Sequence, residues 1–484
     1  MNLIPIEAKV NGNYLCTWEM QYFVSKKIGK YDEKFPTVGQ RDSINYETLF
    51  GEDNGLLNAV ERKYRGDLFL VLDDGWDVPC GCNSYEETEP QPYGALSPHP
   101  DRFPFKGNDT ERLSALVKEV EKLGYAGTGL WIPTQMLGER KIDRENKEFP
   151  ESYWIEKAKM FKEAGISYLK IDWGLHGEPY YRRKLTAVFH KYCPKVLVEH
   201  ACCQGPFTNP EWPRGRKETS IETLKCSDVF RLYDVLPPFD RVCMLSRADE
   251  VLSGERERFE NSKGNLNAEI CTYIAAALGF NIGIMQYKRE DEACIRWQRI
   301  APPFSVYDTD YKRSQEVLTD THFWHTDPVF WFSLRGKWLR ESAPAVMARG
   351  CELPKVSARG EIKPFVVASK NPHTGAYSIA AIKRNINPNT DLIAEADVEF
   401  SVEAAANIGV FGYFGSLTLS FDMPIEGKKV FVQDMLSDEA VDVTDKVDVS
   451  GKRLYISGED LRIFGSMSRS SEETTEPSLI IKVM

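Results

Sequence analysis

Over the first two-thirds of the chain, short apolar segments alternate with longer segments of helical periodicity, and this alternation limits the fold more than any other feature. It is typical of repeated β-α units around a parallel sheet. Seven of the eight strands of a (β/α)8 barrel can be assigned in this way, and we expect the missing one between residues 252 and 267. The seven assigned strands are residues 15–23, 68–73, 127–132, 168–172, 196–199, 229–233 and 281–285.

Two of the intervening segments carry helix signals at both ends. In the first, apolar residues recur at helical spacing from Leu113 to Leu123, with Asn108 as a candidate N-cap and Gly124 as a candidate stop. The second runs from about residue 154 to 164 and ends before Gly165. Both lengths suit the outer helices of a barrel.

The pattern changes after about residue 365, where short β-rich segments follow one another without a helical period. This predicts a C-terminal antiparallel β-sandwich. We therefore expect two domains, a catalytic barrel over residues 1–350 and an all-β sandwich over 351–484. We expect residues 298–351 to form the last barrel helix and the bridge between the domains. The predicted sandwich strands are 365–370, 377–383, 398–402, 417–421, 430–433, 454–457 and 479–483.

Composition excludes several classes of protein. The net charge of −11 and the absence of a basic stripe argue against a nucleic-acid partner. No apolar stretch is long enough to span a membrane and no signal-like start is visible, so we expect a cytoplasmic protein, or a secreted or periplasmic one if a signal peptide was removed. The eleven cysteines lack the spacing of a metal site, and we expect neither a metal nor another cofactor.

Carboxylates stand where several predicted strands end. Asp73 and Asp74 follow the second strand, Asp172 ends the fourth, Glu199 ends the fifth and Asp234 follows the sixth. The C-terminal ends of barrel strands meet at one face, which is where barrel enzymes hold their catalytic groups. A cluster of carboxylates is typical of glycoside cleavage, in which one attacks the anomeric carbon and another protonates the leaving oxygen.

Each of these residues also has a structural interpretation. Asp172 alone could be a helix cap, Asp73-Asp74-Gly75 could be a turn, and Glu199 could belong to a salt bridge. Their coincidence on successive strands favours a site, and the cations Lys170 and Arg231 are placed to offset the negative charge. Four indoles could supply flat walls for a sugar ring, those of Trp18, Trp76, Trp131 and Trp173.

Residues 14–290 resemble the glycoside hydrolase clan of families 27 and 36, which holds the α-galactosidases, the α-N-acetylgalactosaminidases and the raffinose synthase relatives. The motifs that carry the resemblance occur in the family's order along the chain. They are Cys16-Thr17-Trp18-Glu19, Asp73-Asp74-Gly75-Trp76, Asp101-Arg102-Phe103-Pro104, Lys170-Ile171-Asp172, and Glu199 with Gly205-Pro206.

The resemblance implies a retaining exo-α-glycosidase that acts on a carbohydrate through a covalent glycosyl-enzyme. It implies Asp172 as the nucleophile, Asp73 and Asp74 as ligands of sugar hydroxyls, and an acid/base on strand six shortly after an arginine. Asp234, after Arg231, fits that position better than its rival Asp228. The family's seventh-strand Asp-Pro-Asp-Met is absent, and the nearest pattern is Asn267-Ala268-Glu269, which we interpret as opening a helix.

Three other functions are compatible with the same residues. A raffinose synthase-like galactosyl transferase would share every catalytic residue and differ only in the acceptor. A catalytically inactive relative would bind sugars without releasing them. A metal-dependent barrel lyase would lose its activity on chelation, whereas a glycosidase of this type would not.

Overall fold

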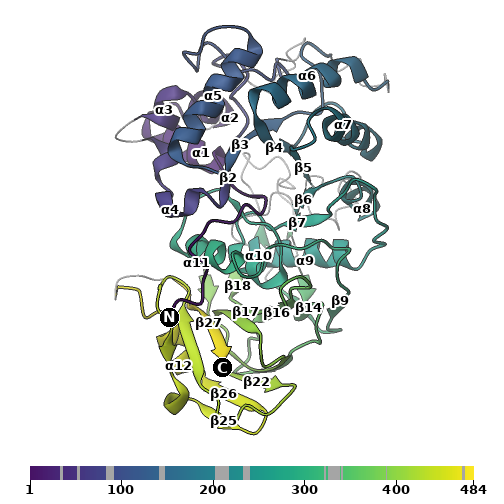
Figure 1. Cartoon of the computed structure of the whole chain (residues 1–484). Helices are drawn as coiled ribbons and strands as arrows, with labels where there is room; N and C mark the ends of the chain where they lie inside the picture. Colours follow the sequence, from purple (N-terminus) through teal and green to yellow (C-terminus); the bar gives the residue numbers. More distant parts are fainter. Residues whose placement is uncertain are drawn as a thin grey trace.

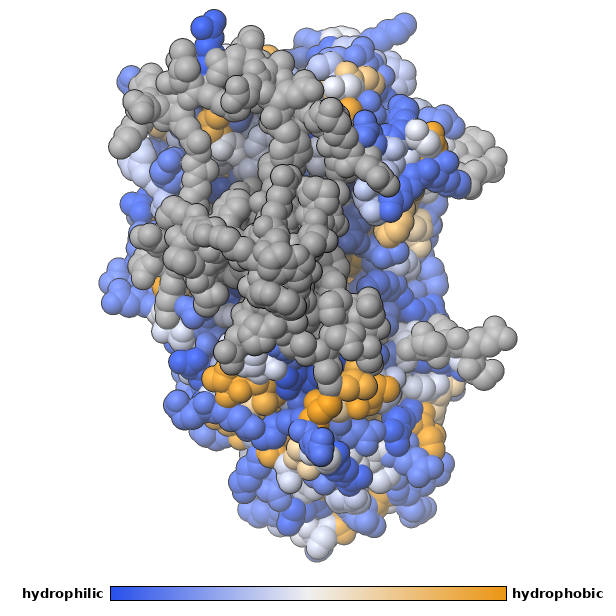
Figure 2. All heavy atoms as spheres, turned by 180° about the vertical axis from the view of Figure 1, so that it is seen from behind, coloured by the Kyte–Doolittle hydropathy of each residue, from blue (hydrophilic) through white to orange (hydrophobic). Residues whose placement is uncertain are grey.

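The computed structural model describes residues 1–32, 36–51, 55–82, 92–140, 148–201, 217–232, 240–320, 323–324, 338–339, 342–387, 390–470 and 475–484. Figure 1 shows a barrel in the upper part of the molecule and a β-domain below it, with both chain termini at the β-domain. No helix within these ranges is long and apolar enough to cross a lipid bilayer. On the face seen in Figure 2, hydrophobic residues gather mainly in one band, and most of the remaining coloured surface is hydrophilic.

The first sheet is an eight-stranded parallel barrel. Its strands are hydrogen-bonded in the order β7-β6-β5-β4-β3-β2-β1-β8. The Asn281 N–H donates to Leu266 O at 2.7 Å and the Ile270 N–H donates to Gly283 O at 3.0 Å, which closes the ring between its last two strands. The strands are β1 (Asn13–Cys16), β2 (Leu68–Leu72), β3 (Gly127–Ile132), β4 (Ile166–Ile171), β5 (Leu197–Ala201), β6 (Val229–Arg231), β7 (Asn265–Asn267) and β8 (Gly283–Ile284).

Helices follow the strands and surround the barrel. The longer ones are α1 (Trp18–Lys27), α5 (Asp109–Leu123), α6 (Glu151–Ala164), α7 (Pro179–Tyr192), α8 (Lys217–Leu224), α9 (Asp240–Leu252), α10 (Thr272–Leu278) and α11 (Arg289–Gln298). Shorter helices between β1 and β2 are α2 (Pro36–Asp42), α3 (Tyr46–Phe50) and α4 (Arg62–Arg65). Helix α5 has the predicted caps, since Asn108 and Glu111 form a capping box and Gly124 adopts a left-handed conformation at φ +85°.

The predicted barrel is therefore confirmed, with three corrections. Residues 298–351 do not contain the last barrel helix, because that helix, α11, ends at Gln298. The apolar run 15–23 is not one strand, because β1 ends at Cys16 and α1 begins at Trp18. The segment Asn267-Ala268-Glu269 does not open a helix. Asn267 is the last residue of the missing strand β7, and α10 begins only at Thr272.

The second domain is a sandwich of two sheets. The larger has the order β24-β23-β27-β21-β17-β16-β14-β9 and the smaller β15-β20-β22-β26-β25. The larger sheet comprises β9 (Tyr311–Arg313), β14 (Val346–Arg349), β16 (Phe365–Lys370), β17 (Tyr377–Ile382), β21 (Asn407–Gly412), β23 (Val430–Asp434), β24 (Val441–Asp442) and β27 (Ser478–Val483). The smaller comprises β15 (Lys355–Ala358), β20 (Ala396–Val402), β22 (Ser416–Phe421), β25 (Asp448–Ser450) and β26 (Arg453–Ser457).

The sandwich differs from the prediction in detail. Three strand pairs are parallel rather than antiparallel, namely β14 with β16, β17 with β21 and β20 with β22. A short helix, α12 (Gly458–Phe464), follows β26 where no helical period was recognised. The inner faces of the two sheets supply a core of apolar side chains.

The two domains are packed tightly against each other. Trp297 of α11 is fully buried and its indole N–H donates to Ser378 Oγ at 3.1 Å. It lies against Gly409 of β21, where a Cβ atom would come within 2.9 Å of the indole ring. The first residues of the chain also attach to the sandwich, since the Leu3 N–H donates to Gln433 Oε1 at 2.6 Å and the Ala440 N–H donates to Met1 O at 2.8 Å.

Candidate active site

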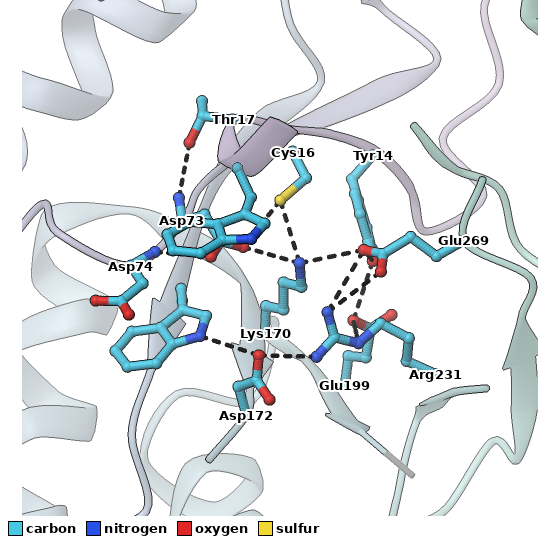
Figure 3. Close-up of polar contacts among 12 residues, drawn as sticks. Tyr14, Cys16, Thr17, Asp73, Asp74, Lys170, Asp172, Glu199, Arg231 and Glu269 are labelled. Atoms are coloured by element: carbon cyan, nitrogen blue, oxygen red, sulfur yellow. Dashed lines mark hydrogen bonds and ion pairs between the residues drawn. The ribbon is translucent and has the colours of Figure 1, made fainter. Parts of the chain in front are cut away.

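The interior of the barrel carries a network of buried ionic groups near the C-terminal ends of the strands. Alternate residues of a strand point to the same side, so Lys170 and Asp172 both project inward from β4 and its end. Two cations, Lys170 and Arg231, are paired with four carboxylates in this network (Figure 3). The carboxylates are Asp73, Asp172, Glu199 and Glu269, and all four are buried, with Asp172 the most exposed at 8%.

Asp172 directly follows β4 at the barrel mouth. Its Oδ2 accepts a hydrogen bond from the Trp131 indole N–H at 3.2 Å and lies 3.0 Å from an Arg231 guanidinium nitrogen. Its backbone is held as well, because Arg182 donates to Asp172 O at 2.7 Å. No residue in the described part of the chain donates a hydrogen bond to Oδ1. One carboxylate oxygen is thus fixed and the other is left for a reactant.

Lys170 offsets negative charge, as expected, but it pairs with Asp73 and Glu269 rather than with Asp172. Its Nζ lies 2.8 Å from Asp73 Oδ2 and 3.1 Å from Glu269 Oε1, and it donates to Cys16 Sγ at 3.2 Å. Burial and the nearby Arg231 lower the pKa of Lys170, but the carboxylates outweigh them and raise it well above its usual value. Lys170 is therefore a permanent cation between β2 and β7.

Glu269 is the carboxylate of this network that the sequence analysis did not assign to the site. It lies two residues after β7, accepts a hydrogen bond from the Tyr14 hydroxyl at 2.7 Å, and bridges Lys170 and Arg231, the latter at 3.4 Å. Burial raises its pKa, but the two cations outweigh burial and lower the pKa to about 2. The sign that could have revealed it was a carboxylate just after the expected seventh strand, but the short polar strand Asn265–Asn267 has no apolar pattern.

Glu199 lies deeper in the barrel and is fully buried. Its Oε2 accepts hydrogen bonds from the Tyr168 hydroxyl at 2.9 Å and from the Asn267 amide at 2.7 Å, and its Oε1 lies 3.8 Å from Arg231 Nε. Burial raises the pKa of Glu199 to about 7, despite the opposing effect of Arg231. The salt-bridge interpretation of this residue thus agrees with its contacts.

The four tryptophans predicted to line the site differ in how far they are buried. Trp18 and Trp173 are half-buried. Trp131 is 1% exposed and reaches the site through its indole N–H. Trp76 is fully buried and donates its N–H to Trp131 O at 2.9 Å. It therefore has no ring face free for a sugar, because its position after β2 turns it into the protein.

The two aspartates that follow the second strand, Asp73 and Asp74, have different ion-pair partners. Asp73 faces Lys170, whereas both oxygens of Asp74 are bound by the Arg41 guanidinium, at 3.0 and 2.7 Å. Burial raises the pKa of Asp74, while its ion pair with Arg41 opposes that shift. Asp73 is thus the member of the pair that faces the network, and Asp74 is held by α2.

Of the two candidates for the acid/base, Asp228 lies within the described residues and Asp234 does not. Asp228 immediately precedes β6, so it lies at the N-terminal end of the barrel, opposite to Asp172. There its Oδ2 accepts the Val198 N–H at 3.0 Å and lies 2.8 Å from His190 Nε2. That position excludes it as the partner of Asp172. Asp234 falls within residues 233–239, outside the described residues, and its role stays a prediction.

No known family model matches the sequence, and no curated protein is similar to it at a significant level. Among solved structures, the chain is similar to a family 27 β-L-arabinopyranosidase from Geobacillus stearothermophilus, with a TM-score of 0.44, 10% identity and coverage of 98% and 97% of the two chains. It is similar to a Bacillus halodurans protein provisionally assigned as an α-N-acetylgalactosaminidase, with a TM-score of 0.41, 10% identity and coverage of 100% and 99%. It is likewise similar to an Anoxybacillus α-amylase, with a TM-score of 0.43, 10% identity and coverage of 98% and 99%. At these scores the functional argument rests on the residues of the site.

Proposed function

We propose that the protein is a retaining α-glycoside hydrolase of the type found in glycoside hydrolase families 27 and 36, with Asp172 as its nucleophile. One observation carries the proposal. Asp172 lies at the mouth of a closed barrel with Oδ2 fixed by Trp131 and Arg231, while Oδ1 accepts no hydrogen bond from the described residues. An oriented carboxylate with one available oxygen is the group that a double displacement requires.

In the proposed reaction, Asp172 Oδ1 attacks the anomeric carbon and the bond from that carbon to the leaving oxygen breaks. Asp234 donates a proton to the leaving oxygen, and a glycosyl ester of Asp172 remains. Asp234 then takes a proton from water, and the resulting hydroxide displaces the sugar from Asp172. This two-step reaction requires the carboxyl groups of Asp172 and Asp234 to be about 5–5.5 Å apart.

The other groups bind and orient the sugar. Arg231 is ion-paired with Asp172, and Glu269 holds Arg231 and Lys170 in place. Asp73 and Lys170 offer an acceptor and a donor for hydroxyl groups. Trp18 and Trp173 provide apolar surface for a ring face. The galactose preference of the resembled family is the starting point for choosing substrates.

A panel of nitrophenyl α-glycosides tests the proposal. We expect the wild-type protein to hydrolyse at least one of them and Asp172→Ala to reduce kcat by about 10⁴-fold or more, as for other removed nucleophiles. Azide should restore turnover in this variant and yield the β-glycosyl azide, because azide enters from the face that Asp172 vacates. Asp101→Ala is the matched control, since Asp101 is an exposed carboxylate after the second strand.

The same panel tests Asp234. We expect Asp234→Ala with azide to yield the α-glycosyl azide, because the glycosyl-enzyme still forms and azide then replaces water. Asp228→Asn should change stability rather than the identity of the product, given its place at the opposite end of the barrel. Full activity of Asp172→Ala on every substrate would overturn the proposal.

A further inference from the structure

We propose that Arg182 and His200 position the nucleophile from outside the barrel interior: Arg182 holds the backbone of Asp172, and His200 holds Arg182. The inference rests on the proposed glycosidase function and extends it to two further residues. Both side chains are buried, and they meet between β5 and helix α7, which pack against each other. They act on the reaction through Asp172, so they are positioning residues.

The segment that follows β4 is held by backbone contacts on the side of β3. The Asp172 N–H donates to Ile132 O at 3.2 Å. The Thr134 N–H donates to Trp173 O at 3.1 Å, and the His176 N–H donates to Thr134 O at 3.2 Å. These bonds continue the pairing of β3 with β4 beyond the end of both strands.

Arg182 supplies the contacts on the other side of this segment. The pairing of β4 with β5 ends at Ile171 and His200, so the next carbonyl, Asp172 O, lies beyond it. From α7, the Arg182 guanidinium donates to Asp172 O at 2.7 Å, to Ile171 O at 3.3 Å and to Gly177 O at 3.4 Å. One side chain thus holds both ends of the segment that carries the nucleophile.

His200 holds Arg182 in turn. Successive residues of β5 point to opposite sides, so Glu199 faces the barrel interior and His200 faces α7. A guanidinium can only donate, so His200 Nδ1, 3.1 Å from Arg182 Nη1, accepts and carries no proton. The ring proton is therefore on Nε2, which lies 2.7 Å from Thr186 Oγ1. The Thr186 hydroxyl donates to Arg182 O at 3.0 Å, which closes the chain of hydrogen bonds.

The neutral form of His200 agrees with its surroundings. Burial and the neighbouring cations Arg182 and His190 lower the pKa of His200 well below its usual value. A neutral imidazole can accept from Arg182, whereas an imidazolium could only donate and would repel it.

Arginine is a costly residue for a contact with the backbone. The partners of Arg182 are three carbonyl oxygens and an imidazole nitrogen, all neutral, and among the described residues no carboxylate pairs with it. Burying a cation without a counter-charge opposes folding. Its advantage is a rigid planar group with five N–H donors, which can bind several acceptors in one fixed geometry. The cost therefore indicates that the position of this segment matters.

The position of Asp172 determines where its free oxygen lies. Oδ2 is held by Trp131 and Arg231, and Oδ1 has to reach the anomeric carbon. Reacting atoms need to be about 3–3.5 Å apart, and a displacement of about 1 Å can lower the rate about 10²-fold. Because Arg182 holds the backbone that carries both oxygens, its loss should slow bond formation and leave sugar binding nearly unchanged.

The first experiment measures kcat and KM on the nitrophenyl α-glycoside that the wild-type protein hydrolyses fastest. We expect Arg182→Ala to lower kcat about 10²-fold, with KM within about twofold of wild type. Arg182→Lys keeps the charge if the alanine variant does not fold, and kcat should again fall at constant KM, because one ammonium group cannot reach all four acceptors. Arg183→Ala is the matched control, since Arg183 is the next residue of α7 and pairs with the half-exposed Glu222.

Two substitutions of His200 separate its acceptor from its bulk. His200→Phe keeps a ring and removes the acceptor, and it should lower kcat about tenfold, the loss of one hydrogen bond to a charged group. His200→Asn keeps an acceptor near the place of Nδ1, so kcat should stay within about threefold of wild type.

Unchanged kcat in the Arg182 variants, a rise in KM in place of the fall in kcat, or equal kcat in the two His200 variants would overturn the positioning role. If the wild-type protein hydrolyses no glycoside, the proposed function fails, and hydrogen–deuterium exchange of residues 171–177 then tests the positioning separately. Faster exchange of this segment in Arg182→Lys than in Arg183→Ala supports it. Equal exchange in the two variants contradicts it.

Discussion

The barrel and the sandwich bury very different interiors. The sandwich core consists of apolar side chains such as Leu417, Val432 and Ile481, whose burial alone stabilises the domain. The barrel encloses the ionic network of Lys170, Arg231 and their carboxylates, whose desolvation costs several kcal/mol per ion before pairing offsets it. A barrel can be filled with apolar layers, so a charged interior indicates a cost retained for chemistry.

The two domains should differ most when one charged residue is removed from the barrel network and one apolar residue from the sandwich core. Glu269→Ala leaves Lys170 and Arg231 without their shared partner and should destabilise the protein by about 3–5 kcal/mol. It should also lower kcat about 10²-fold, because Arg231 is released from its position beside Asp172. Leu417→Ala should destabilise the protein by about 2–5 kcal/mol, because it leaves a cavity in the sandwich core. The folded variant should keep the wild-type kcat.

Denaturation curves and initial rates measure both variants. Glu269→Gln is the companion variant, since it keeps the shape of the side chain and removes its charge. A Glu269→Gln protein with wild-type kcat and KM would show that the bridge between the cations has no part in catalysis.

The pH dependence of stability distinguishes the two interiors next. The pKa of Glu199 is raised from 4.5 to about 7, so the folded protein holds the proton more tightly than the unfolded chain. The stability contributed by this proton is full below about pH 4.5 and is lost as the pH rises towards 7. The pKa of Glu269 is lowered to about 2, so its contribution is full above about pH 4.5 and is lost as the pH falls towards 2.

Urea denaturation between pH 3 and 8 checks both signs. Burial also raises the pKa values of Asp77 and Asp291 to about 7, so these two carboxyls share the loss of stability between pH 4.5 and 7. We expect Glu199→Gln to make this loss smaller, and Leu417→Ala to lower the whole curve without changing its shape. A Glu199→Gln protein whose stability declines as steeply as that of the wild-type protein would assign the decline to the other groups.

A smaller difference is expected between two tryptophan variants, one at the barrel mouth and one between the domains. Trp173 is half-buried at the mouth, with its ring 5.4 Å from that of Trp131, whereas Trp297 is fully buried between the domains. Trp173→Ala should raise KM about tenfold, the equivalent of about 1.4 kcal/mol of ring stacking. Trp297→Ala should lower the melting temperature and leave the KM of the folded protein close to wild type. The reverse assignment of effects would contradict the proposed sugar wall.

Chelation should have the smallest effect. In the network, Lys170 stands between Asp73 and Glu269, and Arg231 stands between Asp172 and Glu269, so cationic side chains occupy the places between the carboxylates. Among the described residues, no group of histidine, cysteine or acidic side chains is arranged to hold a metal ion. We expect activity after exhaustive EDTA treatment and dialysis to stay within about twofold of the untreated protein, the scatter of such assays, whereas a metal-dependent lyase would lose it.

The regular parts of this architecture follow from local signals. Strand β3 and the caps of α5 match the prediction because apolar runs and the Asn108–Glu111 capping box act over a few residues. Strand β7 has only three residues, two of them asparagine, and its pairing with β6 depends on the closed barrel rather than on its own pattern. Glu269 was missed for that reason.

The same contrast between local signals and long-range contacts applies to the site. Asp172, Lys170, Arg231 and Asp73 come together as the strand ends indicate, because parallel strands bring their C-terminal ends to one face. Which cation pairs with which carboxylate depends on the register between strands and on side-chain rotamers. The pairing of Arg41 with Asp74 links two segments 33 residues apart, and no spacing rule predicts it.

The attachment of residues 1–4 to the sandwich has a consequence for how the chain assembles. Met1 and Leu3 bond to Ala440 and Gln433, and β1 pairs with β8 across about two hundred and seventy residues. Residues 1–4 therefore gain these partners only after residues 433–440 have been made. Such long-range closure makes folding slow and leaves an early barrel strand unpaired on one edge during synthesis. Completing the sandwich is then also the step that fixes the segment leading into β1.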